Sequence, residues 1–383
     1  MHVKLKAPVV DKARRLVIKL GSSVVTTGAS LQRDNIGRLV AEMSALCEQG
    51  YEVIVVSSGA RAAGLPALKM TEIPSRIPEQ QAAAAVGQIS LMALYEEFFS
   101  DFGRHVGQVL LTAADIGDRT RYLNARHTME HLLAHGVVPV VNENDSVAID
   151  ELKFGDNDRL SALVAGLMDA DLLIILSDVD GVFDEDPRLG ESRLREVVEN
   201  IDDTIGRCGG LPGQLGTGGM TSKLKAAASA SHRGIATVVA SGLNAGVLGR
   251  VLDPNTPEGS FIPAADNPIS GRKHWIAYSL PLRGRLGLDA GAVRAMASRG
   301  SSLLPAGIKS VDGQFSAGDC VSCLDPDGVE VARGLIAYDA DDCRRISGMS
   351  SGQIEATLGY HISDEVIHRD DMVVLNPSTR EDS

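Results

Sequence analysis

The sequence predicts an α/β protein: a three-layer sandwich around a mainly parallel sheet, followed by a small, β-rich, barrel-like domain. Two observations support this fold class. Over the first 260 residues or so, short β-branched or leucine-rich runs alternate with helical patterns, which favours a parallel sheet with helices on both faces. From about residue 283 the apolar runs are shorter and turn signals are dense, as in small β-barrels.

The predicted elements of the first domain follow one another in regular alternation. Strands are expected at residues 15–20, 51–56, 106–111, 137–141, 172–176 and 236–240. Helices are expected at residues 31–49, 79–102, 119–135, 158–168 and 221–233. Such strand–helix alternation places the carboxyl ends of the strands along one edge of the sheet, where open α/β sheets bind ligands.

The domain boundary is predicted from a change in composition. Residues 253–268 carry four prolines, and the pattern changes beyond them. We therefore expect a first domain at 1–265, a linker at 266–280, a second domain at 281–375 and a frayed tail at 376–383. Turn signals at 312–313, 317–319 and 325–328, with short helical patterns at 289–299 and 339–346, fill the second domain.

Composition excludes several classes of protein. The 383 residues include 44% hydrophobic and 4% aromatic residues, with a net charge of −13. Few aromatics and an acidic balance argue against binding nucleic acids or anionic membranes through bulk electrostatics. We find no signal peptide and no apolar run of about 20 residues, so we expect a cytoplasmic protein. The five cysteines fit a reducing compartment, and Cys320–Cys323, formally C-x-x-C, alternates like a strand.

The segment Asn142–Asp158 is the most polar strand-end sequence in the chain. It contains six carboxylates and three asparagines directly after the apolar run 136–141. A plain solvated loop does not need so many short, stiff acceptors at that point. Acids and amides there would suit a substrate with an amino group, together with a metal or with lysines from elsewhere in the chain.

Two glycine-containing turns carry a lysine. Lys19–Ser23, at the end of the first strand, could present an ammonium group and backbone N–H groups to a phosphate; the alternative is an ordinary strand-end turn with a solvated lysine. Leu215–Lys223 holds three glycines before a helix that Thr221 or Ser222 could cap. The helix dipole disfavours Lys223 in the first turn, which indicates an anionic ligand such as a polyphosphate.

Two further turns end predicted strands. The hydroxyls and N–H groups of Ser57–Ala60 suit a carboxylate or phosphoryl group, or simply an N-cap with nothing bound. In Leu176–Gly181, Asp178 and Asp180 could hold a ribose, an adenine amino group or the water shell of Mg²⁺, or form a plain Asx turn. The histidines at 127, 131 and 135 share a helix face but lack a third type of metal ligand.

Taken together, these motifs resemble the amino-acid kinase family, and within it the members that phosphorylate glutamate. The residues that carry the resemblance are Lys19–Ser23, Ser57–Ala60, Val140–Ser146, Phe154–Asp158 and Gly216–Lys223. Residues 299–309 and 368–372 resemble a PUA domain, a small β-barrel often found in RNA-modifying proteins. The resemblance extends from about residue 15 to 375. Ser57 and Ser177 stand where threonine is also common, which keeps the hydroxyl.

The resemblance implies ATP-dependent phosphorylation of the side-chain carboxylate of L-glutamate to L-glutamyl 5-phosphate, the first step of proline biosynthesis. It also implies Mg²⁺, proline as feedback inhibitor, a homo-oligomer (dimer or tetramer) and hand-over to the downstream reductase. By the same resemblance, Ser58, Asp145 and Asn157 would contact glutamate. The ATP contacts would be Lys19, Ser177, Asp178, Thr217, Gly218, Gly219, Met220, Thr221, Ser222 and Lys223.

The expected chemistry follows from the residue types. Glutamate has an unperturbed side-chain pKa of about 4.3, so it arrives as an ionised nucleophile and needs no general base. Lys19 and Lys223 would neutralise charge on the transferred group, and Asp158, with Asp156 as a second candidate, would orient them or the metal's waters. Asn142–Asp145 would take the amino-acid end, with Asp145 pairing with the substrate ammonium. Which acids contact Mg²⁺ is left open.

Two rival functions follow from the same sequence. Another amino-acid kinase could act on acetylglutamate, aspartate, carbamate or a nucleotide, against which the PUA-like domain and the Asn142–Asp158 sequence discriminate. An RNA-binding protein is the rival from a different class. Residues 272–360 contain ten Lys plus Arg and ten Asp plus Glu, so the second domain lacks the basic excess that RNA binding favours.

Overall fold

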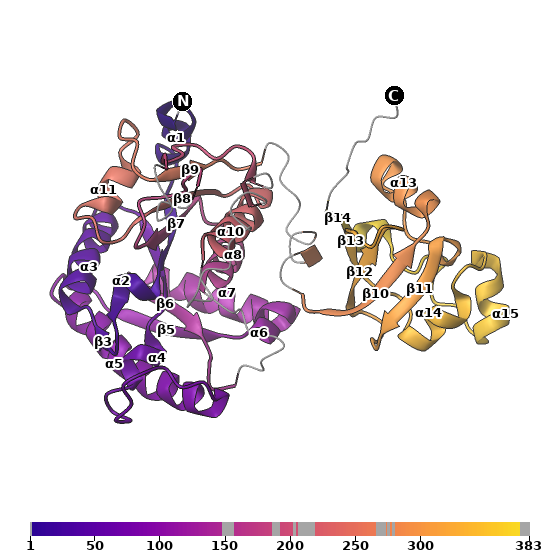
Figure 1. Cartoon of the computed structure of the whole chain (residues 1–383), viewed down its shortest axis with the longest axis horizontal. Helices are drawn as coiled ribbons and strands as arrows, with labels where there is room; N and C mark the ends of the chain where they lie inside the picture. The colour runs from indigo at the N-terminus through magenta and orange to yellow at the C-terminus, as the bar shows by residue number, and fades with distance from the viewer. Residues whose placement is uncertain are drawn as a thin grey trace. The chain divides into compact units, whose positions relative to one another are not determined.

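The computed structural model describes residues 2–147, 157–185, 192–201, 204–205, 219–265, 273, 276–277 and 280–375. The chain divides into two compact units, Met1–Pro268 and Ile269–Ser383 (Figure 1). Most of the predicted linker at 266–280 and the whole predicted tail lie outside the described residues, so the proposed domain limits remain predictions.

The first unit is built on a seven-stranded sheet with the strand order β5-β6-β4-β1-β7-β8-β9. In that order the strands are Val106–Leu111, Val138–Glu143, Glu52–Ser57, Arg15–Leu20, Leu172–Ser177, Ala236–Ser241 and Ser260–Ile262. Neighbouring strands run parallel except for β8 and β9, which are antiparallel. The predicted strands are all confirmed, and their carboxyl ends share one edge.

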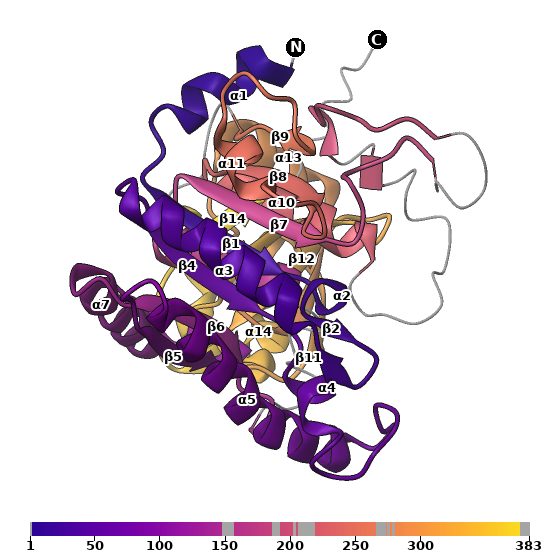
Figure 2. The same ribbon diagram turned by 90° about the vertical axis from the view of Figure 1, so that its left-hand side faces the viewer.

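Helices cover both faces of this sheet, which gives three layers (Figure 1); Figure 2 looks onto one of these faces. One face packs against α3 (Arg33–Glu48), α5 (Ile77–Ser100) and α11 (Val247–Leu252). The other packs against α7 (Arg119–Ala134), α8 (Asn157–Leu167) and α10 (Met220–His232). The shorter elements are α1 His2–Val10, α2 Ser22–Val25, α4 Ala60–Gly64, α6 Ala113–Gly117, β2 Thr26–Thr27 and β3 Ser30–Leu31.

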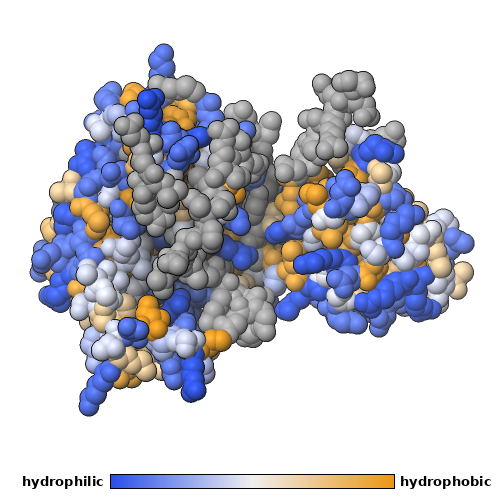
Figure 3. All heavy atoms as spheres, viewed as in Figure 1, coloured by the Kyte–Doolittle hydropathy of each residue, from blue (hydrophilic) through white to orange (hydrophobic). Residues whose placement is uncertain are grey.

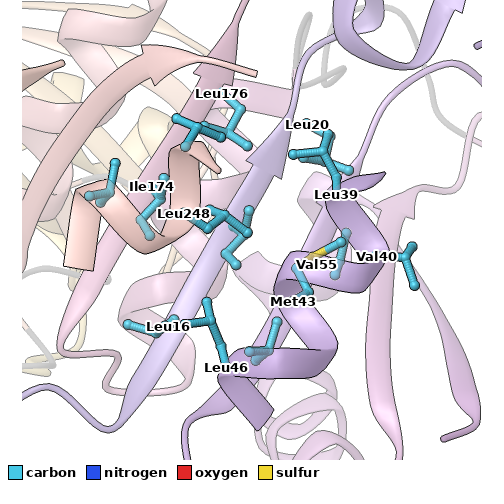
Figure 4. Packing of buried hydrophobic residues seen from close by; sticks show 14 of the residues in the cluster. Leu16, Leu20, Leu39, Val40, Met43, Leu46, Val55, Ile174, Leu176 and Leu248 are labelled. Atoms are coloured by element: carbon cyan, nitrogen blue, oxygen red, sulfur yellow. The ribbon is translucent and has the colours of Figure 1, made fainter. Parts of the chain in front are cut away.

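Strand alternation decides which residues enter which layer. Successive side chains of a strand point to opposite faces, and the even-numbered Leu16, Ile18 and Leu20 of β1 join the core beneath α3 (Figure 4). There they meet Leu39 and Met43, which are fully buried. Burial of each such side chain stabilises the fold by about 1.5–3 kcal/mol. The odd-numbered residues face α8 and α10, which places the polar Lys19 on the opposite side.

Helices α4 and α5 cross with their backbones in contact. A Cβ atom at Gly64 would lie 1.9 Å from the carbonyl oxygen of Ala83, and one at Gly87 would lie 1.9 Å from that of Ala60. Only glycine permits this approach. The crossing fixes the start of α4, and therefore the turn between β4 and α4, against the long helix α5.

The second unit is small and β-rich, with its own core. Its five-stranded sheet has the order β11-β10-β12-β13-β14. In that order the strands are Ile308–Gly313, Leu282–Leu288, Cys320–Leu324, Glu330–Leu335 and Met372–Val374. The helices are α13 Ala290–Arg299, α14 Ala340–Ile346 and α15 Ile354–Leu358, with 3-10 turns at Pro305–Gly307, Ser351–Gln353 and Arg369–Asp371. Cys320 and Cys323 are free thiols buried in β12, as the strand pattern predicts.

Three expectations need correction. Asn142 and Glu143 do not follow strand β6 but form its last two residues, because both are buried and paired with β5. The segment expected to be only a domain boundary contains the edge strand β9, whose Phe261 packs into the core. Helix α1 was not predicted, since its charged residues obscure the buried face formed by His2, Lys6 and Val10.

Hydrophilic residues cover most of the visible described surface of the first unit, with hydrophobic residues scattered among them (Figure 3). None of the helices in the described part of the chain has the length and hydropathy needed to cross a bilayer.

Candidate active site at the carboxyl ends of the parallel strands

Four strand ends bring the predicted polar residues to one edge of the sheet. Lys19 lies near the end of β1, Ser57 at the end of β4, Asn142 near the end of β6 and Ser177 at the end of β7. Strands β6, β4, β1 and β7 are consecutive neighbours. The motifs that are scattered over 160 residues of sequence are therefore adjacent in space, at the position where open α/β sheets bind ligands.

The centre of this edge is a buried carboxylate between two lysines. The Nζ atom of Lys19 lies 2.6 Å from Oδ1 of Asp158, and Nζ of Lys223 lies 3.3 Å from Oδ2. The side chain of Asp158 is fully buried, and those of the lysines are 5% and 6% exposed. Ser222 Oγ also donates to Asp158 Oδ2, at 2.7 Å. Strand β1 and helices α8 and α10 thus converge on one carboxylate.

The lysines keep Asp158 ionised. Burial opposes ionisation of this carboxyl, but the charges of Lys19 and Lys223 outweigh that effect, so the pKa of Asp158 lies below its usual value. Two ammonium groups and one carboxylate give this three-residue cluster a net positive charge in a region with little access to water, and Asp178 lies close enough for the charge of Lys223 to lower its pKa. A buried excess of positive charge favours an anionic ligand, because water cannot screen it there.

Helix α10 adds to this positive field. It begins at Met220, and its N-cap residue is Gly219. The prediction that Thr221 or Ser222 caps the helix is wrong, because both lie within the first turn and Ser222 bonds to Asp158. The first N–H groups of a helix are an anion-binding site, and here they lie one turn from Lys223.

Beside this centre lies a group of amides and hydroxyls. The Nδ2 atom of Asn157 donates to the Ser57 carbonyl at 2.7 Å, to Asn142 Oδ1 at 2.9 Å and to Ser58 Oγ at 3.2 Å. Asn142 Nδ2 in turn donates to Gln88 Oε1 at 2.9 Å. Three of the residues expected to contact the substrate are therefore directly linked, across β4, β6 and α8.

Asp145 has an arginine partner that was not predicted. Arg61 Nε of α4 lies 3.6 Å from Asp145 Oδ1, and the Asp145 side chain is 11% exposed. This pair places one further cation beside the turn that begins α4. The signal in the sequence was that Arg61 directly follows the motif Ser57–Ala60. Nothing in the sequence pairs Arg61 with Asp145, which is 84 positions away.

At the end of β7, Asp178 places a second carboxylate at this edge of the sheet, beside Ser177. Ser177 Oγ donates to Asp178 Oδ1 at 3.0 Å. Partial burial by itself would raise the pKa of Asp178. Hydrogen bonds from its own backbone, Ser177 and Ser23 lower the pKa by more than burial raises it, so this carboxyl is ionised at neutral pH. Asp180 Oδ1 accepts from Asn244 Nδ2 at 3.1 Å.

Several predicted residues are not tested by this geometry. Asp156, Thr217 and Gly218 lie outside the described residues. Within the described ranges, no group of three or more His, Cys, Asp or Glu side chains is arranged to hold a metal ion. His127, His131 and His135 are exposed on α7 and line a shallow pocket with Leu132 and Val137.

A parallel sheet that presents buried lysines, a helix N-terminus and a set of amides at its carboxyl edge defines a phosphotransferase of the amino-acid kinase type. The family comparison agrees: residues 14–241 match the amino acid kinase family and residues 284–358 match the PUA domain. The chain belongs to the amino acid kinase family.

Comparison with individual proteins shows to which family within the amino acid kinases the chain belongs. The glutamate 5-kinase of Caldanaerobacter subterraneus subsp. tengcongensis is 45% identical over 364 residues, which cover 94% of this chain and 98% of that protein. The glutamate 5-kinase of Trichlorobacter lovleyi is 46% identical over 377 residues, or 98% of this chain and all of that protein. The enzyme of the same name from Geobacter sulfurreducens is 45% identical over 374 residues, 97% and 100% of the two chains. Within the amino acid kinases, the chain belongs to the glutamate 5-kinase family.

Proposed function

We propose that the protein transfers the γ-phosphoryl group of ATP to the side-chain carboxylate of L-glutamate, giving L-glutamyl 5-phosphate and ADP, the first step of proline biosynthesis. The observation that carries this proposal is the pair of buried lysines around Asp158. Kinship with glutamate 5-kinases over nearly the full chain supports the choice of substrate.

The geometry suits phosphoryl transfer to a carboxylate. The nucleophile is already ionised at neutral pH, and catalysis of phosphoryl transfer depends on alignment and on stabilising charge. Lys19 and Lys223 would supply that charge at the transferred group and the leaving oxygens. Asp158 is held ionised by both lysines, so its role is to position them rather than to accept a proton.

The substrate would lie along the amide group. Ser58, Asn142 and Asn157, which are joined by hydrogen bonds, would bind glutamate, with Asp145 facing its ammonium group and Asp156 bordering the reacting phosphate. ATP would be held by Lys19, Ser177, Asp178 and the segment Thr217–Lys223.

Magnesium would enter as the ATP complex. Mg²⁺ in kinases is commonly held by one or two carboxylates together with the substrate phosphates, so a cluster of three protein ligands is not required. The ionised Asp178 at the end of β7 fits this demand, whereas Asp158 is engaged by the lysines. The metal would neutralise charge on the phosphates.

Three further properties belong to the same proposal. Proline acts as a feedback inhibitor, the chain assembles as a dimer or tetramer, and the protein works in the cytoplasm. The product is an acyl phosphate, which water hydrolyses readily, so direct hand-over to the downstream reductase would protect it.

The test is a glutamate-dependent ADP assay with hydroxylamine, which converts an acyl phosphate into a coloured hydroxamate. We expect hydroxamate only when both ATP and glutamate are present, with aspartate, acetylglutamate and carbamate as comparison substrates. ADP release with one of those substrates and none with glutamate would reject the assignment.

A further inference from the structure

We propose that Gln88, on helix α5, is a positioning residue for the amino-acid substrate: it holds Asn142 in one amide orientation and, through Asn142, sets the hydrogen bonds of Asn157 and Ser58. This inference rests on the proposed function, because it concerns how that site recognises glutamate. Gln88 is 54 positions from Asn142 in the chain and is itself buried.

Two backbone groups fix the direction of every hydrogen bond in this chain of amides. The Glu143 N–H can only donate, and it donates to one atom of the Asn142 amide at 2.9 Å. That atom must be the oxygen, so the Asn142 nitrogen faces Gln88, which must present its own oxygen. At the other end the Ser57 carbonyl can only accept, so Asn157 must face it with nitrogen.

The hydrogen bonds in this series of amides therefore all point the same way: Asn157 donates to Asn142, and Asn142 donates to Gln88. Because Asn157 also donates to Ser58 Oγ, the Ser58 hydroxyl is an acceptor in that bond and can direct its proton elsewhere. A proton so directed is a donor for a carboxylate oxygen of the substrate. If Asn142 turned its amide over, its nitrogen would face Asn157, and this order would be lost.

Stability alone does not explain a glutamine at position 88. Its Nε2 atom is buried and has no hydrogen-bond acceptor among the residues that the structure describes. A buried donor without an acceptor destabilises a folded protein, and such a group calls for an explanation. A methionine would fill similar space without that penalty, but it would leave the buried Asn142 Nδ2 without the oxygen that it binds. The two effects on stability oppose each other, so we attribute the glutamine to the orientation that its oxygen gives Asn142.

Neighbouring residues hold Gln88 firmly in place. Gly87 lies against the Ala60 carbonyl in the crossing of α4 and α5. About two turns further along, Tyr95 shares a buried hydrogen bond of 2.8 Å with Ser57 Oγ. Helix α5 thus supports both the β4–α4 turn and the end of β6. Tyr95 bonds to the turn without entering the amide chain, so it offers a matched control.

The first test compares Gln88→Met with Tyr95→Phe. For Gln88→Met we expect KM for glutamate to rise about tenfold, the effect of losing one buried hydrogen bond, with KM for ATP unchanged. Tm should stay close to the wild type, because the variant removes the unpartnered Nε2 of Gln88 but leaves Asn142 Nδ2 without its acceptor. Tyr95→Phe should lower Tm while leaving KM for glutamate nearly unchanged. A lower Tm with unchanged KM in Gln88→Met, or equal rises in KM in both variants, would overturn the proposal.

The second test asks whether Gln88 acts through Asn142. If it does, Asn142→Ala alone and Asn142→Ala with Gln88→Met should have the same KM for glutamate, because coupled residues are not additive. Additive rises would reject the relay. A wild-type protein that releases no ADP with glutamate would overturn the proposed function and this inference together, whereas an active wild type with unchanged KM in Gln88→Met overturns the inference alone.

Discussion

Asp158 contacts both buried lysines and combines two tasks. It neutralises part of the charge of two buried lysines, which allows the fold to tolerate them, and it fixes both ammonium groups near one point. Buried charges are retained in proteins at a cost in stability and are therefore concentrated at functional sites. The predicted roles of Lys19, Lys223 and Asp158 meet in this one cluster.

Replacing Lys19 or Lys223 with alanine should lower kcat by about 100-fold or more, since each variant removes one charge that stabilises the transition state. Steady-state assays with saturating ATP and glutamate would measure the loss. Lys225→Ala, an exposed lysine on the same helix α10, is the matched control and should keep wild-type kcat. Wild-type kcat in both Lys19→Ala and Lys223→Ala would refute the mechanism.

Asp158→Asn should destabilise the protein by about 3–5 kcal/mol at neutral pH, because it removes the buried carboxylate that both lysines contact. The pKa of Asp158 is lowered in the folded state. Its contribution is therefore fully present above the unfolded pKa of about 3.9 and is lost as pH falls through the lower folded value. Urea unfolding of both proteins at several pH values would measure this; an equal difference at all pH values would contradict it.

Some residues of the site could not be predicted from sequence. Lys19, Ser58 and Asn157 were accessible because each lies in a short motif beside a strand end. Gln88 was not, because helix α5 looks like an ordinary apolar helix and the partner of Gln88 is 54 positions away. Arg61, on α4, was not predicted either, because its partner Asp145 is 84 positions away. Pairing over such distances is a property of the packed structure.

At the scale of secondary-structure elements, close contacts of two glycines set the geometry of the β4–α4 turn. Helices α4 and α5 touch through Gly64 and Gly87. Regular strands and helices were predictable because their apolar periods are clear, whereas α1 and β9 were not. Helix α1 buries a histidine and a lysine, His2 and Lys6, and β9 has three residues, too few for a period-2 pattern to be distinguished from a loop.

Gly64→Ala and Gly87→Ala should each destabilise the protein by about 1–3 kcal/mol, as overpacked sites do, because the new methyl would overlap a carbonyl oxygen. The β4–α4 turn must then shift, so KM for glutamate should rise while KM for ATP stays constant. Gly249→Ala on α11 has open space around the new methyl and should stabilise instead, by about 0.5–1 kcal/mol. The measurements are the denaturant midpoint and the KM for glutamate of all three variants. If Gly64→Ala and Gly87→Ala did not differ from Gly249→Ala in these quantities, the packing argument would be wrong.

At the scale of the whole molecule, the site and the second unit are separable. Every described residue of the proposed site belongs to Met1–Pro268, and each unit closes its own hydrophobic core. The acidic balance of the chain, −13 in all, gives no electrostatic reason to expect that the PUA domain draws RNA to the kinase unit.

A chain shortened to residues 1–268 should therefore fold and keep glutamate-dependent ADP release with a kcat of the same order as the full chain. A domain that buries its own core can fold alone, and the lysine–carboxylate cluster lies on elements that this piece retains. Circular dichroism would establish folding and the hydroxamate assay would measure activity. A folded but inactive fragment would show that the second unit contributes to catalysis, which neither the placement of the site residues nor the separate cores predicts.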